Sequence, residues 1–176
     1  MSEETPARKP TLYILSAPSG GGKSSLARAL VERAQDTVTS VSHTTRPERT
    51  GETHGVDYFF VDQSEFEQMI KDDGFLEYAR VFDHWYGTSR KVVEQAIVQN
   101  RSIMLDIDWQ GAQQVRRAFP AAVSVYILPP SVEALAQRLV DRGRDSPDEI
   151  TSRLSEAASE MSHYDEYDQI LINTNF

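Results

Sequence analysis

Short apolar runs alternate with stretches of helical spacing along most of the sequence. The runs LYIL, VTSV, IMLDID, VSVYIL and QILI occupy residues 12–15, 38–41, 103–108, 123–128 and 169–172. Apolar residues three and four positions apart fill stretches between them, at 26–34, 92–97 and 132–139. Strands that alternate with helices predict a parallel sheet covered by helices on both faces. Ligands in such folds bind beyond the carboxyl ends of the strands.

Two polar segments interrupt this rhythm. Residues 43–55, HTTRPERTGETHG, are rich in turn formers, and the runs DYFFV and FLEYARVF follow them. This pattern predicts a small β-rich lobe inserted into the α/β core. The other segment, DRGRDSPDE at 141–149, joins two helical patterns and is expected to begin as a mobile basic loop. Within it, Ser146, Pro147 and Glu149 have the spacing of a helix N-terminus with a capping box.

The composition limits the class of protein. A length of 176 residues, with 39% apolar and 26% charged residues, suits a single α/β domain that has small inserted lobes. The net charge of −9 argues against non-specific nucleic-acid binding, which depends on clustered Lys and Arg side chains. Any anion-binding site in this chain must therefore be locally basic.

Cysteine usage and the N-terminal segment bear on location. The sequence contains no cysteine and no apolar run long enough to suggest a membrane span. The first ten residues, MSEETPARKP, lack the apolar segment of a signal peptide. We therefore expect a cytoplasmic protein without a membrane partner, with a flexible tail over residues 1–10. The four histidines show no metal-ligand spacing, and we expect structural or surface roles for them.

A glycine-rich segment, SAPSGGGKSS at 16–25, lies between the first apolar run and the first helical pattern. It is similar to the pattern G-x-x-x-x-G-K-[ST], in which backbone N–H groups hold phosphate oxygens and the Lys reaches the terminal phosphates. Gly22 and Lys23 fit this pattern, whereas Ala17 replaces its first glycine. Because Pro18 favours an extended conformation for the residue before it, positive φ is not needed at Ala17. The alternative is a plain glycine-rich turn between a strand and a helix.

Two aspartates end a later apolar run. Asp106 and Asp108 alternate with Ile107, so both can project from one edge of the strand end. There they can approach Mg²⁺ or its water shell beside a nucleotide, as can the hydroxyl of Ser24. The alternative is that one of the aspartates caps a helix that starts near Trp109.

The inserted lobe carries a second candidate anion site. Arg46 and Arg49 lie beside a glycine turn and offer forked donors to a phosphate, and Tyr58 adds a hydroxyl. Glu77 lies further along the same lobe. A carboxylate suits guanine, which presents adjacent donors at N1 and N2, whereas adenine presents an acceptor at N1. The alternatives are a solvated arginine pair and a surface glutamate.

These residues carry a resemblance to the guanylate kinase family, whose members transfer the γ-phosphoryl group of ATP to GMP. The resemblance extends from about Thr11 to Asn173. The segment TTRPERTGETHGVDYFF at 44–60 is highly specific to the family, and APSGGGKSS at 17–25 is the family's own variant of the phosphate loop. The resemblance implies a P-loop, three-layer α/β fold with a parallel core sheet, and tolerance of dGMP as a substrate.

The resemblance also implies a division of the chain and a set of site residues. The expected core is 11–42, 89–130 and 154–176, the GMP-binding lobe is 43–88, and the helical lid is 131–153. The implied GMP-binding residues are Ser42, Arg46, Arg49, Tyr58, Glu77, Tyr86, Thr88 and Asp108. The implied ATP-binding residues are Ala17, Pro18, Ser19, Gly20, Gly21, Gly22, Lys23, Ser24, Ser25, Arg138 and Asn173. The implied catalytic cations are Lys23, Arg46, Arg142 and Arg153, and Ser24 and Asp106 would hold Mg²⁺, partly through water.

The sequence departs from the family at its end. Members usually continue with another helix after the strand near Asn173, whereas this sequence stops at Phe176. We expect this difference to bear on stability more than on the chemistry of the site.

Two rival functions use related folds. The guanylate-kinase-like domains of membrane-associated scaffolds bind phosphopeptides, but they tend to lose the phosphate loop that Lys23 and Ser24 complete here. A kinase acting on a phosphorylated sugar would have no use for Glu77 or for the segment 46–58. The sequence therefore favours the nucleotide kinase, and it leaves the oligomeric state open.

Overall fold

The computed structural model describes residues 9–34, 36–141, 143 and 146–174. A five-stranded sheet in the order β2-β7-β1-β8-β9 forms its core, and every ladder between these strands is parallel. The strands are β1 (Leu12–Ser16), β2 (Thr37–Thr39), β7 (Ser102–Asp106), β8 (Val123–Leu128) and β9 (Gln169–Ile172). The parallel sheet predicted from the alternating pattern is confirmed.

Helices cover both faces of this sheet. They are α1 (Lys23–Arg33), α3 (Arg90–Val98) and α4 (Trp109–Ala118). Because successive strand residues point to opposite faces, Ile14 and Leu105 pack with α3 and α4. Their neighbours Leu15 and Met104 pack on the other face with α1. The runs of β1, β7 and β8 therefore each serve two cores, which is why they are continuously apolar, whereas β9 at the edge of the sheet is exposed.

A second sheet, in the order β4-β3-β6-β5, forms the predicted β-rich lobe. The elements of the lobe are β3 (His43–Thr44), β4 (Phe59–Phe60), α2 (Gln63–Lys71), β5 (Phe75–Val81) and β6 (His84–Ser89). Helix α2 was not among the sequence predictions. Its signals are local, since the Asp62 side chain accepts from Glu65 N as an N-cap and Phe66 is fully buried.

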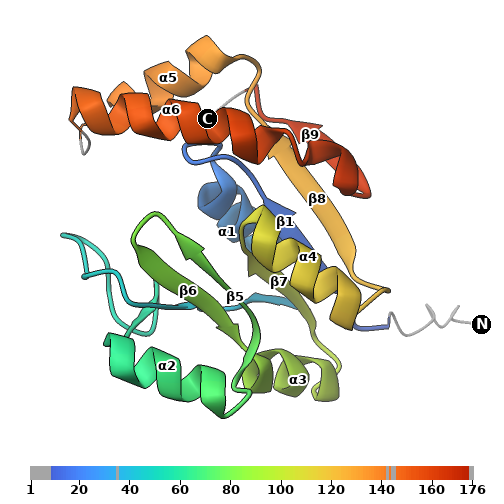
Figure 1. Cartoon of the computed structure of the whole chain (residues 1–176). Coiled ribbons are helices and arrows are strands. Elements are labelled where there is room, and N and C mark those ends of the chain that lie inside the picture. Colours follow the sequence, from blue (N-terminus) through green and yellow to red (C-terminus); the bar gives the residue numbers. More distant parts are fainter. Residues whose placement is uncertain (1–8, 35, 142, 144–145, 175–176) are drawn as a thin grey trace, which may run out of the picture.

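Helices α5 (Val132–Asp141) and α6 (Pro147–Met161) pack against each other at the opposite end of the molecule from α2 (Figure 1). The one-turn helix η1 (Tyr164–Glu166) then leads to β9. The predicted capping box is confirmed, because Ser146 Oγ accepts from Glu149 N and the Glu149 carboxylate accepts from Ser146 N. Within the described residues, no helix is long and apolar enough to cross a membrane.

Candidate active site

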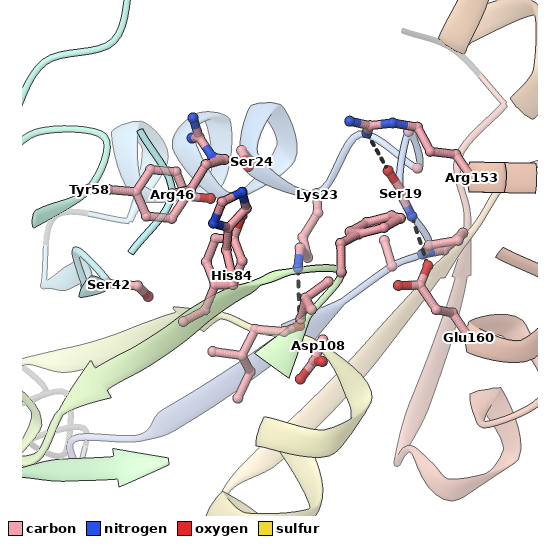
Figure 2. Close-up of a pocket in the computed structure, with 18 of the residues that line it drawn as sticks. Ser19, Lys23, Ser24, Ser42, Arg46, Tyr58, His84, Asp108, Arg153 and Glu160 are labelled. Atoms are coloured by element: carbon pink, nitrogen blue, oxygen red, sulfur yellow. Dashed lines mark hydrogen bonds between the residues drawn. The ribbon is translucent and has the colours of Figure 1, made fainter. Parts of the chain in front are cut away.

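A cavity of about 700 Å³ lies beyond the carboxyl ends of β1 and β7, where the fold class places a ligand. Arg46 and Tyr58 lie on one side of it and Ser19 and Glu160 on the other, with Lys23 between them (Figure 2). Most residues of the predicted site line this cavity: Ala17, Pro18, Ser19, Gly20, Gly21, Gly22, Lys23, Ser24, Ser25, Ser42, Arg46, Arg49, Tyr58, Glu77, Tyr86, Asp108 and Arg153.

The phosphate loop has a backbone suited to an anion. Gly22 is the N-cap of α1, with a left-handed φ of 90°, and no side chain caps this helix. The first N–H groups of α1 therefore remain available to an anion. Ala17 is not among the residues with positive φ, so the loop has no left-handed backbone at the position of the pattern's first glycine.

Lys23 lies in a charged cluster below the loop. Its Nζ is 2.9 Å from Asp106 Oδ1 and donates to the Ile107 carbonyl at 3.1 Å. Ser24 Oγ donates to the other carboxylate oxygen of Asp106 at 2.7 Å. Burial alone would lower the pKa of Lys23, but the Asp106 carboxylate outweighs burial and raises the pKa above its ordinary value. Lys23 is therefore held as a cation at the centre of the cavity.

The arginine site of the lobe is built around a carboxylate. Arg46 Nη2 donates to the two Glu52 oxygens at 2.9 and 3.0 Å, and Glu52 also accepts from Arg49 N at 2.9 Å. The Arg46 guanidinium lies 5.4 Å from the ring centroid of Tyr58, whose ring also contacts that of Tyr86. Burial opposes the charge of Arg46, but the hydrogen bond to Glu52 prevails and the pKa of Arg46 is raised. The result is a fixed guanidinium between two phenols, which suits a phosphate.

Glu77 is a buried carboxylate at the wall of the cavity. It is 4% exposed and lies on β5 opposite Thr88 of β6. A Cβ at Gly111 would overlap Glu77 Oε2, so glycine allows helix α4 to approach this closely. Burial raises the pKa of Glu77 to about 7, and Thr88 offsets this effect only in part. Asp108 caps α4 by accepting from Gly111 N at 2.8 Å and still lines the cavity, so the capping alternative does not remove it from the site.

Helix α6 holds the phosphate loop at one residue. Arg153 Nη1 donates to Ser19 Oγ at 2.9 Å, and Glu160 Oε2 accepts from Ser19 N at 3.0 Å (Figure 2). Burial raises the pKa of Glu160, and the hydrogen bond from Ser19 N partly offsets that effect. Two turns of α6 therefore fix the same point of the loop, and a movement of α6 would move the loop with it.

Four described residues of the predicted site lie outside the cavity lining: Thr88, Asp106, Arg138 and Asn173. The last two support the phosphate loop from behind. Arg138 Nη2 donates to the Asn173 carbonyl at 2.8 Å, and Asn173 Nδ2 donates to the Gly21 carbonyl at 3.2 Å. Arg142, the other predicted lid arginine, lies outside the described residues.

The sequence interpretation missed five residues that shape the site: Glu52, Phe82, His84, Gly111 and Glu160. Glu52 could have been found, because it lies inside the segment that carries the family resemblance. His84 lines the cavity, in addition to the structural or surface role expected for the histidines (Figure 2). Gly111 and Glu160 act through contacts with distant parts of the chain, for which the sequence gives no local signal.

Comparison with known proteins places this geometry in a family. The guanylate kinase family profile matches residues 9–176. The chain is 58% identical to the guanylate kinase of Methylococcus capsulatus, over 94% of this chain and 81% of that protein. It is 54% identical to the guanylate kinase of Chromohalobacter salexigens, over 97% and 80% of the two chains. The crystal structure of guanylate kinase from Anaplasma phagocytophilum superposes with a TM-score of 0.79 at 36% identity, covering 96% of this chain and 80% of that one. The chain therefore belongs to the guanylate kinase family.

Proposed function

We propose that this chain transfers the γ-phosphoryl group of ATP to GMP, and also to dGMP, with release of ADP. The observation that carries the proposal is a single cavity lined both by a phosphate loop and by a buried carboxylate. The loop suits the phosphates of ATP, and the two acceptor oxygens of Glu77 suit the adjacent donors of guanine. Membership of the guanylate kinase family supports the same pair of substrates.

The GMP side of the proposed site is formed by the lobe and the start of α4. The phosphate of GMP would be held by Arg46, Arg49, Tyr58 and Tyr86. The guanine would be held by Ser42, Glu77, Thr88 and Asp108. The buried position of Arg46 and the closeness of both phenols support the first set, and the burial of Glu77 beside Thr88 supports the second.

The ATP side of the proposed site is formed by the loop 17–25 and the helices behind it. Lys23 would reach the terminal phosphates, and its raised pKa supports a permanent charge there. Arg138 and Asn173 would support the loop near the adenosine end of ATP. Arg153 and Arg142 would bring positive charge to the transferring phosphoryl group as the lid closes.

Mg²⁺ fits the residues near Lys23. Ser24 Oγ and the Asp106 carboxylate lie 2.7 Å apart, and both are oxygen ligands of the kind that Mg²⁺ prefers. Among the described residues, no group of three or more His, Cys, Asp or Glu side chains could form a protein-only metal site. The coordination sphere of a metal ion held here would therefore be completed by phosphate oxygens and water, as is usual for Mg²⁺. Once bound, it would neutralise negative charge on the terminal phosphates.

Phosphoryl transfer requires alignment and charge neutralisation more than covalent chemistry from the protein. Lys23, Arg46 and Arg153 line one cavity, so they can act on one phosphoryl group and on the phosphate that accepts it. We assign no residue the role of general base. Closure of the lobe and lid would exclude water from the phosphoryl group.

The proposal includes a division of labour within the fold. Residues 43–88 form the GMP-binding lobe, residues 131–153 form the lid, and the rest of 11–176 forms the core. The two separate sheets support the division between lobe and core, and the pairing of α5 with α6 supports a helical lid, although α6 continues to Met161, beyond the proposed boundary at 153. The cysteine-free composition supports a cytoplasmic location.

A coupled assay of ADP release tests the proposed function. ATP and Mg²⁺ are combined in turn with GMP, AMP, CMP and UMP, and we expect rapid turnover with GMP and little with the others. A preparation of Lys23→Ala, purified in the same way, measures contaminating kinase activity. If the wild-type chain releases no ADP in response to GMP, the proposal fails and the phosphopeptide-binding alternative gains support.

A further inference from the structure

The tip of the β5–β6 hairpin carries a residue with an unusual conformation. Phe82 is the first of two residues that connect Val81 to His84, and its φ is 53°. Left-handed φ is unfavourable for a bulky side chain, and glycine or asparagine is usual in such connections. Phe82 is 44% exposed and is not part of the buried core, so its ring is only partly covered. A strained backbone at a bulky residue outside the core is a reason to examine the contacts that its ring makes.

Phe82 lines the cavity and reaches a residue of α6. Arg153 Cζ lies 5.7 Å from the centroid of the Phe82 ring, which is within the range of a cation–π contact. The same guanidinium donates through Nη1 to Ser19 Oγ at 2.9 Å. Arg153 is therefore held between the hairpin tip of the lobe and the phosphate loop of the core.

We infer that Phe82 is a positioning residue that holds the Arg153 guanidinium over the cavity for the transferring phosphoryl group. This inference rests on the proposed function. An aromatic ring contacts the flat face of a guanidinium, so the N–H donors at its edge stay directed at Ser19 or at an anion. Since Phe82 belongs to the lobe with the arginine site and Arg153 to the helix beside the phosphate loop, their contact joins the two substrate sides. The place of Arg153 then depends on the place of the lobe.

Three substitutions separate this role from a structural one. Phe82→Tyr keeps the ring, Phe82→Leu keeps an apolar side chain without a π face, and Phe82→Gly removes the side chain and suits the positive φ. We expect kcat to fall by roughly three- to thirtyfold in the Leu and Gly variants and to stay within about twofold in the Tyr variant. The KM values for ATP and GMP should change little. The Tm of Phe82→Gly should stay close to that of the wild type, because the relief of strain offsets the loss of a partly covered ring.

The control is Asp83→Ala, which alters the other residue of the same connection. Asp83 has a side chain that is 94% exposed, and the variant should keep the wild-type kcat. A wild-type kcat in Phe82→Leu would overturn the inference, as would an equal loss in the Tyr and Leu variants. A Phe82→Gly variant with a lower Tm and a higher KM for both nucleotides would indicate a structural role and would also overturn it. If the wild type itself shows no GMP-dependent ADP release, the proposed function fails, whereas an active wild type with unaffected variants contradicts only the role of Phe82.

Discussion

Replacing Glu77 with Gln tests the proposed recognition of guanine with almost no change of shape. Glu77 is 4% exposed and Gly111 packs against its Oε2, so an amide of the same size keeps the contact with α4. The amide turns one acceptor oxygen into an NH₂ donor. That donor would face a donor of guanine, whereas N1 of adenine can accept from it.

The expected size of the effect follows from the burial of Glu77. Mismatching a buried hydrogen bond to a charged group costs about 2 to 4 kcal/mol, or roughly a thirtyfold to thousandfold loss in kcat/KM for GMP. AMP should lose much less. The measurement is kcat/KM for both nucleotides on both proteins, with Glu65→Gln, an exposed position on α2 of the same lobe, as the control. Equal losses for GMP and AMP would refute the reasoning, because Glu77 would then support the lobe and not recognise the base.

The pH dependence of this variant gives a second test. Because the pKa of Glu77 is about 7 before GMP binds, kcat/KM for GMP should rise between about pH 6 and 8 as the carboxyl ionises. The Gln variant should lack this rise. Stability should change in the opposite direction, because a pKa raised from 4.5 to about 7 gives stability below pH 4.5 that is lost as the pH rises through 7. The free energy of unfolding in urea of the Gln variant, minus that of the wild type, should therefore increase as the pH rises from about 5 to 8. A difference that does not change with pH would contradict the assigned pKa.

Four further outcomes are expected. Lys23→Ala should lower kcat by about two to four orders of magnitude and keep the wild-type circular dichroism spectrum, because the lost charge acts mainly in the transition state; near-normal turnover would contradict the role of Lys23. Solution scattering should show compaction with GMP plus a non-hydrolysable ATP analogue, as the lobe and lid close over the phosphoryl group, and no change would argue for a static binding module. EDTA should abolish turnover and excess Mg²⁺ should restore it, whereas activity that persists in EDTA would remove the metal from the proposal. Glu160→Ala should raise the KM for ATP several-fold more than that for GMP, because Glu160 holds the phosphate loop at Ser19, and equal changes would contradict this selectivity.

Local sequence patterns predicted the core of the fold but not all of the lobe. The runs at 12–15, 103–108 and 123–128 contain most of the three central strands. Because these strands are buried on both faces, their sequences are continuously apolar and can be recognised without knowledge of the neighbouring strands. Helix α2 was missed because turn formers before it and strand-like runs around it dominated the interpretation of the lobe. Its own signals, an N-cap at Asp62 and a single buried residue, Phe66, are too few to predict a helix by themselves.

In the candidate site, too, features formed by one continuous segment were predicted, whereas contacts between distant segments were not. The phosphate loop is continuous in sequence, so its residue spacing together with the family resemblance was enough to predict it. The contact between Glu77 and Gly111 joins β5 to α4, and that between Ser19 and Glu160 spans 141 positions. No pattern of residue types encodes such contacts, because they arise only when the sheets and helices are packed. Phe82 was missed for another reason, since a phenylalanine in a hairpin connection carries no sign of the left-handed backbone that it adopts.

The donors of the proposed phosphate sites already have carboxylate partners within the chain. These pairs are Lys23 with Asp106, Arg46 with Glu52, and the Ser19 N–H with Glu160. In a protein with a net charge of −9, the first two pairs keep a half-buried lysine and a buried arginine beside a carboxylate, so a locally basic site does not leave unpaired charges in the interior. Under the proposed function, the nucleotide phosphates would replace carboxylate oxygens at Lys23 and Arg46, whereas Glu160 would keep its contact with Ser19 N. Because a phosphate offers more oxygens and more charge than a carboxylate, this exchange would favour the nucleotide, and its free energy would be the difference between two strong interactions.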